Sequence, residues 1–271
     1  MEREQIRISV RNLVEFILRS GDIDNRRASL DTMEAMQAGS RLHRKIQKKM
    51  GSTYHAEVPL NIIIEEENYE LGIWGRADGI IIEETVTIDE IKGVYLSLDL
   101  LEEPVKVHLA QAKCYAYIYG IQNDLQKINV QMTYGNLDTG DLKYFSYEYS
   151  MQQLQEWFSD LILKYKKWAD FQYEWRKKRQ ASIKELAFPF PYREGQKELA
   201  AGVYRTIARK KNLFIQAPTG VGKTISTLYP AIKAVGEGLG DKIFYLTAKT
   251  VTANVAKETL GILCEKGYRA K

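Results

Sequence analysis

Residues 74–92, WGRADGIIIEETVTIDEIK, contain two acids and a lysine, Asp78, Glu90 and Lys92, that could act together. If the two apolar runs in this stretch form antiparallel strands joined by a short turn, their register places Asp78 opposite Glu90. Side chains alternate between the two faces of a strand, so Lys92 shares the face of Glu90 whereas Asp89 points to the other face. Acids on an otherwise apolar face need a compensating charge. The spacing therefore predicts either a divalent-metal site or a structural ion pair on a half-exposed hairpin.

Carboxylate oxygens at this spacing suit Mg²⁺ or Mn²⁺, which keep part of their water shell and accept phosphate oxygens. Such an ion polarises a phosphodiester and lowers the pKa of an attacking water. A lysine beside it adds positive charge where a pentacovalent phosphate develops. We therefore expect Asp78 and Glu90 to bind one or two metal ions and Lys92 to assist the nucleophile, which makes all three candidate catalytic residues.

Three segments of the chain together resemble the RecB-like branch of the PD-(D/E)xK nucleases. The spacing D-x(11)-E-x-K, from Asp78 to Lys92, resembles the motif that gives these nucleases their name. MQAGSRLHRKI resembles the first motif of the branch, in which a helical histidine, here His43, joins the metal site. HLAQAKCYAYIY resembles the last motif, and its Gln111 and Tyr115 lie at i and i+4, on one face of a helix.

This resemblance implies a restriction-endonuclease-like α/β core, in which helices flank a mixed central sheet. It also implies that Gln111 and Tyr115 hold the DNA backbone and stack on a base, with Arg76 as a further phosphate contact. Many nucleases of this branch carry four cysteines for an iron–sulfur cluster, but Cys114 is the only cysteine in this part of the chain. No iron–sulfur cluster is therefore expected. The implied metal ligands are His43, Asp78, Glu90 and the main-chain carbonyl of Ile91.

Residues 213–224, LFIQAPTGVGKT, have the order of a phosphate-binding loop: an apolar strand, a glycine-rich turn and the start of a helix. Gly220 and Gly222 let the backbone approach a phosphate group and turn its N–H groups toward it. The N-terminus of the following helix adds a favourable dipole. Lys223 would reach the outer phosphates and the Thr224 hydroxyl would bind Mg²⁺, so this loop predicts nucleotide binding.

The loop and its neighbours strongly resemble the DinG and XPD-like branch of the superfamily-two helicases. The loop has Ala217 where the strict motif has glycine, and A-P-T-G-x-G-K-T is the form seen in that superfamily. FPYREGQ resembles the segment whose glutamine, here Gln196, reads adenine, and IFYLTAKTVTANVAKE resembles the next strand and a loop that touches single-stranded DNA. The resemblance implies a partial P-loop (RecA-like) α/β domain that binds ATP. No DEAH-like acidic segment follows, so we expect ATP hydrolysis and unwinding only in a longer natural protein.

The apolar pattern indicates which elements position these side chains. Helical spacing, alternating β-branched runs, and breaks at glycine or proline divide the chain into segments. Pro189 and Pro191 mark a linker near 180–190, so we expect a nuclease domain at 1–183 and a helicase segment at 184–271. The expected elements are helices at 6–19, 31–49, 104–121 and 151–184, an antiparallel meander at 57–92, and strands at 127–134, 142–149, from Leu213 onward and at 242–247.

Composition bounds the class of protein. The 271 residues are 45% apolar and 27% charged, which is typical of a globular protein of about two domains and not of a disordered chain or a coiled coil. No apolar stretch is long enough to span a membrane, and charges interrupt the N-terminal region where a signal peptide needs an apolar run. We therefore expect a cytoplasmic protein without a membrane partner. The net charge of +4 does not by itself indicate nucleic acid.

Residues 151–184 mix tryptophans with lysines and arginines. This pattern fits either an ordinary solvated helix with its aromatic residues in the core or a basic edge that follows a phosphate backbone. Taken together, the sequence predicts a metal-dependent, exonuclease-like DNA nuclease that acts on single-stranded DNA or DNA ends, in the N-terminal part of an ATP-dependent DNA helicase of DNA repair. One alternative is a catalytically silent DNA-binding module that loads such a helicase. Another is an ATPase in which ATP gates DNA binding.

Overall fold

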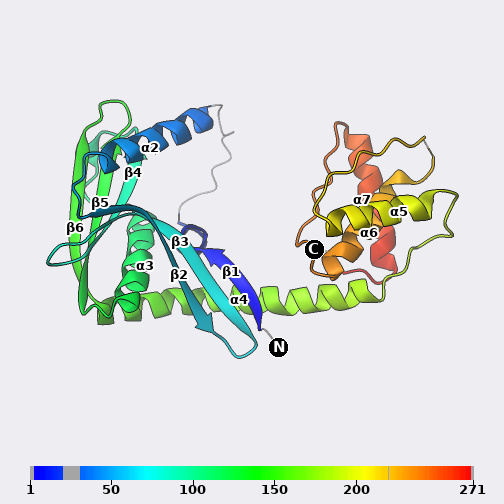
Figure 1. Cartoon of the computed structure of the whole chain (residues 1–271), viewed down its shortest axis with the longest axis horizontal. Helices are drawn as coiled ribbons and strands as arrows, with labels where there is room; N and C mark the ends of the chain where they lie inside the picture. The colour runs from blue at the N-terminus through cyan, green and yellow to red at the C-terminus, as the bar shows by residue number, and fades with distance from the viewer. Residues whose placement is uncertain (1–2, 21–30, 219, 270–271) are drawn as a thin grey trace. The chain divides into compact units, whose positions relative to one another are not determined.

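The computed structural model of the chain describes residues 3–20, 31–218 and 220–269. Backbone contacts divide the chain into two compact units, Met1–Asp170 and Phe171–Lys271. The first unit holds a mixed sheet flanked by helices, and the second holds helices joined by irregular segments (Figure 1). Among the described helices, none is both long and apolar enough to cross a membrane.

A mixed six-stranded sheet forms the centre of the first unit, in agreement with the predicted α/β class. Its strands are β1 (Glu4–Ser9), β2 (Tyr54–Glu65), β3 (Tyr69–Ile81), β4 (Thr87–Val94), β5 (Lys127–Asn136) and β6 (Leu142–Ser150). Strand β1 runs parallel to β3, and β4 runs parallel to β5. The remaining pairs, β2 with β3, β3 with β4 and β5 with β6, are antiparallel.

Strand β3 has a gap between two partners on one of its edges. Strand β2 occupies one edge along nearly the whole length of β3, so β1 and β4 share the other edge in succession. Strand β1 pairs with Tyr69–Trp74, and β4 pairs with Gly79–Ile81. Residues 75–78 therefore have no ladder partner on that edge. The sheet opens at Asp78, where β1 and β4 diverge.

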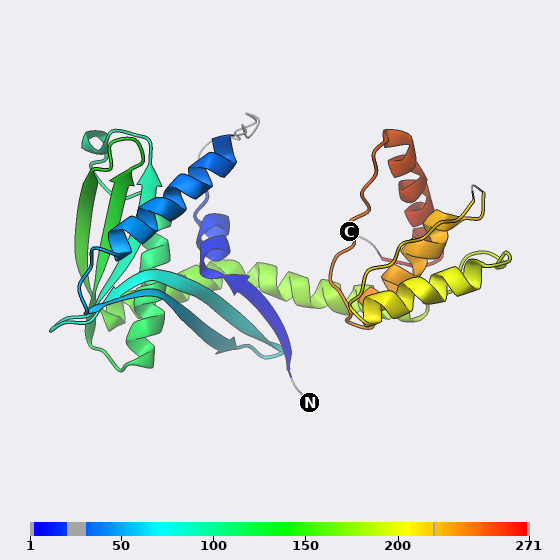
Figure 2. The ribbon, with the colours of Figure 1, turned by 45° about the horizontal axis from the view of Figure 1, so that its top comes forward.

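Helices cover both faces of this sheet. They are α1 (Val10–Ile17), α2 (Asp31–Gln47), the short 3₁₀ helix η1 (Leu98–Leu100), α3 (Lys106–Gln122) and α4 (Met151–Lys184). Ile91 of β4 packs against Leu42 and Ile46 of α2, which runs across one face of the sheet (Figure 2). The next residue, Lys92, contacts Gln111 of α3. Because neighbouring residues of a strand point to opposite faces, α2 and α3 lie on opposite sides of the sheet.

Helix α3 is enclosed between the sheet and the first half of α4. Its buried residues lie on all sides of the helix, from Ala110 to Gly120. Tyr117 stacks on Phe158 of α4 with ring centroids 4.4 Å apart, and the ammonium group of Lys113 lies 4.2 Å from the ring centroid of Trp157. Aromatic residues of this half of α4 thus pack against the core, as the first interpretation of this helix predicted, whereas Trp168 further along is 43% exposed.

The predicted helix at 6–19 is wrong in its first part, because Glu4–Ser9 form β1 and only Val10–Ile17 are helical. The free edge of β3 offers a ladder partner, and the alternation of Ile6 and Ile8 with polar residues suits a strand. The Ser9 hydroxyl then accepts a hydrogen bond from the Asn12 N–H at 3.2 Å and caps α1. Tertiary pairing has overridden the local helical pattern.

The described part of the second unit contains the end of α4 and the helices α5 (Gln196–Ala208), α6 (Lys223–Gly236) and α7 (Thr250–Glu265). The strands predicted from Leu213 and at 242–247 are wrong, because both segments are irregular. A strand of a parallel sheet is buried on both faces. Here Phe214 is 95% exposed and Leu246 is 89% exposed, so no layer covers these segments within the described residues.

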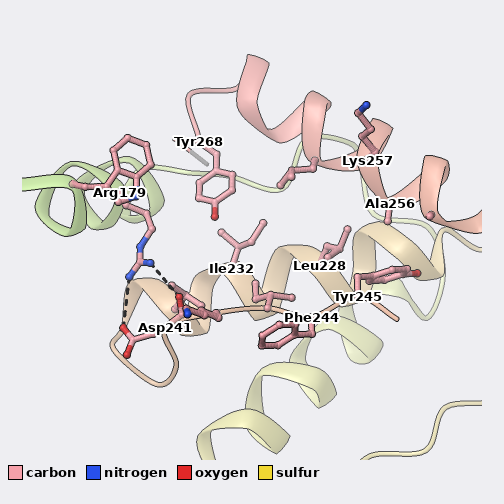
Figure 3. Close-up of a pocket in the computed structure, with 15 residues that line it drawn as sticks. Arg179, Leu228, Ile232, Asp241, Phe244, Tyr245, Ala256, Lys257 and Tyr268 are labelled. Atoms are coloured by element: carbon pink, nitrogen blue, oxygen red, sulfur yellow. Dashed lines mark hydrogen bonds and ion pairs between the residues drawn. The ribbon is translucent and has the colours of Figure 1, made fainter. Parts of the chain in front are cut away.

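Helices α6 and α7 enclose a pocket of about 490 Å³ together with the segment that follows α6 (Figure 3). Leu228 and Ile232 of α6 form its apolar floor, and Phe244 lines it from the irregular segment. A guanidinium N–H of Arg179 donates to the main-chain carbonyl of Asp241 at 3.2 Å. This contact ties the irregular segment to the end of α4 within the second unit.

Candidate metal centre and phosphate loop

The candidate metal centre is built around Asp78, in the part of β3 that has no ladder partner on the edge shared by β1 and β4. The Oδ2 atom of Asp78 accepts a hydrogen bond from the Ile91 N–H at 2.8 Å. Its Oδ1 atom lies 3.5 Å from Nδ1 of His43, which α2 carries to this end of the sheet. The pairs Gly79–Asp89 and Ile80–Ile88 confirm the predicted register of the hairpin. The structure thus brings together one helix and two strands that the sequence linked to a metal site.

Glu57 of β2 belongs to this centre, although no sequence motif singled it out. A carboxylate oxygen of Glu57, an oxygen of Asp78 and a ring nitrogen of His43 lie within 4.8 Å of one another, close enough to bind one metal ion. The backbone of Glu57 is left-handed, with φ of 57°, and the ladder between β2 and β3 is interrupted at this residue. Strained conformations of this kind cluster at functional sites, where the surrounding structure imposes them.

Two neighbouring side chains orient the Glu57 carboxylate. The amide of Gln47, at the end of α2, donates to Oε1 of Glu57 at 3.1 Å and to the main-chain carbonyl of Asp78 at 3.0 Å. The guanidinium of Arg76 lies 2.7 Å from Oε2 of Glu57. The Arg76 side chain is 66% exposed, so it also faces solvent beside the centre.

Glu90 of β4 is fully buried. One of its carboxylate oxygens, Oε2, has no hydrogen-bond partner among the described residues. Nζ of Lys92 lies 2.7 Å from Oε1, the distance of a charge-assisted hydrogen bond between an ammonium group and a carboxylate. Burial and then the charge of Asp78 raise the pKa of Glu90 to about 8. Oxygen and imidazole donors such as those of His43, Glu57 and Asp78 fit Mg²⁺ or Mn²⁺. Glu90 does not belong to that group of three, so its role as a metal ligand stays a prediction.

Gln111 and Tyr115 of α3 contact two residues beside the centre, Lys92 and Arg76. Oε1 of Gln111 accepts a hydrogen bond from Nζ of Lys92 at 3.2 Å. The Tyr115 hydroxyl accepts one from the Arg76 N–H at 3.3 Å, in the gap that β1 and β4 leave on β3. The Tyr115 ring is 3% exposed and packs against Gly75, so the structure does not present it to a base.

Asp89 points away from the centre, as strand alternation predicted. Its carboxylate is fully buried and accepts hydrogen bonds from the side chains of Thr133, Gln131 and Tyr54. A carboxylate satisfied by three donors has a structural explanation that the carboxylate of Glu90 lacks. Of the two adjacent acids of β4, Asp89 is therefore explained by its hydrogen bonds within the protein, and Glu90 is the candidate for a functional role.

The glycine-rich loop contains two glycines in a backbone conformation that other residues rarely adopt. Gly220 and Gly222 are left-handed, with φ of 84° and 72°, and α6 begins directly after Gly222. The ammonium group of Lys223 donates to the carbonyls of Ala217 and Pro218, at 2.9 Å and 2.6 Å. Thr224 lies in the first turn of α6. The loop thus places Lys223 and Thr224 at a helix N-terminus, a position that favours anions.

Gln196 lies against this loop and is 5% exposed. Its amide nitrogen donates to the Val221 carbonyl at 2.7 Å, and its amide oxygen accepts from the Arg193 N–H at 2.8 Å. A Cβ atom at Gly222 would lie 2.4 Å from the same amide nitrogen, so glycine is required there for this close approach. Gln196 therefore fixes the loop through both ends of its amide, and its contact with adenine stays a prediction.

Comparisons with known proteins match parts of the chain. No protein-family model matches it. A segment of 51 residues is 51% identical to the probable ATP-dependent helicase MJ0942 of Methanocaldococcus jannaschii, and the match covers 18% of this chain and 8% of that protein. The crystal structure of SSO0001 superposes on 60% of this chain and 78% of its own, with a TM-score of 0.39 and 20% identity. This structural similarity is below the level that indicates a shared fold.

Proposed function

We propose that this chain is a metal-dependent DNA nuclease joined to a segment of an ATP-dependent DNA helicase. The observation that supports the nuclease most is Glu90, a fully buried carboxyl group whose Oε2 atom has no hydrogen-bond partner among the described residues. A divalent cation would compensate this buried charge. The atoms that would hold Mg²⁺ or Mn²⁺ belong to His43, Asp78, Glu90 and the Ile91 carbonyl, with Glu57 as an additional carboxylate.

The surrounding side chains suit phosphodiester hydrolysis. When bound, the metal would polarise the phosphate and lower the pKa of the attacking water. The Lys92 ammonium, held between Glu90 and Gln111, would place positive charge where the pentacovalent phosphate forms. Arg76 has an exposed guanidinium that would contact a phosphate of the DNA strand. Tyr115 would act as a positioning residue, because its hydroxyl holds the open edge of β3.

The helicase segment is supported by the phosphate loop and by the similarity to MJ0942. We assign residues 1–183 to the nuclease and 184–271 to a partial RecA-like domain. Gly220, Gly222, Lys223 and Thr224 would bind the phosphates and Mg²⁺ of ATP, and Gln196 would contact adenine. Single-stranded DNA, or a duplex with a single-stranded end, is the proposed substrate, because the resembled helicases move along single strands.

Cleavage of end-labelled single-stranded DNA in the presence of Mn²⁺ tests the nuclease. We predict that Lys92→Ala lowers the cleavage rate by about 100-fold or more, since it removes charge stabilisation at the reacting phosphate. Lys127→Ala is the matched control, because Lys127 lies in β5 and pairs with Glu148 at the surface. Equal cleavage by the wild type and Lys92→Ala would refute the assignment.

A catalytically silent DNA-binding module is the second candidate function. It is favoured by the ion pair between Lys92 and Glu90, which partly neutralises the buried acid without a metal. Calorimetric titration with Mn²⁺ separates the two candidates. The nuclease requires Mn²⁺ binding that Asp78→Asn abolishes, whereas DNA binding without any Mn²⁺ binding supports the silent module.

A further inference from the structure

A shallow pocket of about 290 Å³ lies on the exposed face of β1, β2 and β3. The side chains of Trp74 and Ile63, in its lining, are 55% and 53% exposed. Polar and basic side chains, Gln5, Arg7 and Asn61, complete most of the rim, and none of the lining residues is acidic. This surface, called here the Trp74 pocket, combines a free indole ring with a guanidinium and two amides.

Strand register places these side chains on one face. Arg7 lies beside Gly72 in the parallel pair of β1 and β3, and Ile63 lies opposite Gly72 in the antiparallel pair of β2 and β3. Gly72 has no side chain, so it leaves a depression in the surface between Arg7 and Ile63. The Arg7 guanidinium donates to the amide oxygen of Gln5, and the Gln5 amide nitrogen donates to the Glu70 carboxylate at 3.3 Å. Within the described residues, no ion pair joins a carboxylate to Arg7 itself. Its positive charge is therefore available to a ligand.

The Trp74 pocket and the candidate metal centre lie along the same strand, β3. Trp74, Arg76 and Asp78 alternate along β3, and Arg76 pairs with Glu57 of the centre. At about 3.3 Å per residue, the Cα atoms of Trp74 and Asp78 are separated by roughly 13 Å along the strand. Bases that are stacked at about 3.4 Å would span this distance with roughly four nucleotides, and an extended strand with fewer.

We propose that the Trp74 pocket is a subsite for one base of single-stranded DNA whose backbone continues to the metal centre. The inference rests on the proposed function for the direction of the strand. An exposed tryptophan stacks on any unpaired base, and arginine adds charge for the neighbouring phosphate. The bases of a duplex are already stacked on one another, so the pocket selects a single strand.

Fluorescence anisotropy with a labelled thymidine 12-mer in EDTA tests this subsite without any cleavage. We expect Trp74→Ala to weaken binding roughly 5- to 150-fold, the range that loss of one base-stacking aromatic gives. Trp74→Phe retains a ring and should stay within about fivefold of the wild type. Tyr144→Ala is the matched control, since Tyr144 lies on β6 and is 54% exposed.

A 12-mer of the same length with abasic sugars shows whether the contact is to a base. We expect Trp74→Ala to change the affinity for this probe by less than about twofold, because the strand has no base to stack. Equal affinity of the wild type and Trp74→Ala for the thymidine 12-mer would overturn the proposal. So would an equal loss with both probes, or a Trp74→Ala effect confined to self-association of the protein. Inactivity in the cleavage assay leaves these binding results unaffected and refutes only the nuclease.

Discussion

At the scale of single residues, Glu90 is the acid near the candidate metal centre whose ionisation is most strongly opposed by burial. Burial raises its pKa to about 8, whereas glutamate in an unfolded chain has a pKa of about 4.3. Between these values the metal-free folded protein keeps a proton that the unfolded chain has lost. The free energy of unfolding must therefore fall as the pH rises through this window.

We predict that the metal-free wild type loses about 2 kcal/mol of unfolding free energy between about pH 6.5 and pH 8, relative to Glu90→Gln, whose amide does not titrate. Urea unfolding in EDTA at the two pH values measures this difference. His108, whose pKa burial lowers to about 4, does not affect the difference because both proteins contain it. Parallel pH dependence of the two proteins would contradict a buried, protonated Glu90.

At the scale of elements, the fit of α3 against β3 depends on Gly75. A Cβ atom at this position would lie 2.6 Å from Cε1 and the hydroxyl of Tyr115, a buried ring that cannot move aside freely. We predict that Gly75→Ala lowers the free energy of unfolding by about 1–3 kcal/mol through overpacking. Chemical denaturation measures this change.

Gly39→Ala is the control for this substitution. Gly39 lies within α2, and nothing lies within 4 Å of a Cβ atom built there. Alanine has a higher helix propensity than glycine, so this variant should be neutral or more stable by up to about 1 kcal/mol. If Gly75→Ala were as stable as Gly39→Ala, the close approach of Tyr115 would not constrain the sheet.

The hairpin of β3 and β4 was predictable because its partners are close in sequence. A short turn and the alternation of apolar residues were enough to place Asp78 near Glu90 and to turn Asp89 away. Glu57 was not predictable in the same way. Its place depends on the register of β2 with β3 and on a left-handed backbone, and the only sequence signal was one acid among neutral residues in YHAEVPLN.

The wrong element predictions have a common cause, which is the presence or absence of a ladder partner. Residues 4–9 pair with the edge of β3 and become a strand, although the residues after them continue with helical spacing. Residues 242–247 have the apolar character of a buried strand but no partner in the described chain. Local patterns do not report such partners, since pairing is a property of the assembled sheet.

At the scale of the whole molecule, the two candidate sites lie in different compact units. The centre at Asp78 belongs to Met1–Asp170, and the phosphate loop belongs to Phe171–Lys271. A ligand that binds only the folded state stabilises by RT ln(1 + [L]/Kd), about 2.7 kcal/mol at a hundred times Kd. Each ligand should therefore act on the unfolding of the unit that holds its site.

We predict that scanning calorimetry separates the two ligands. ATP should raise the unfolding temperature of the wild type, and Lys223→Ala should abolish this rise while it keeps the response to Mn²⁺. Asp78→Asn should do the reverse, because it removes a metal ligand and leaves the loop intact. Lys266→Ala, at the exposed end of α7, is the control and should respond to both ligands. Absence of any ATP effect on the wild type would refute the phosphate-loop assignment, and loss of the Mn²⁺ response in Lys223→Ala would show that the two sites are not independent.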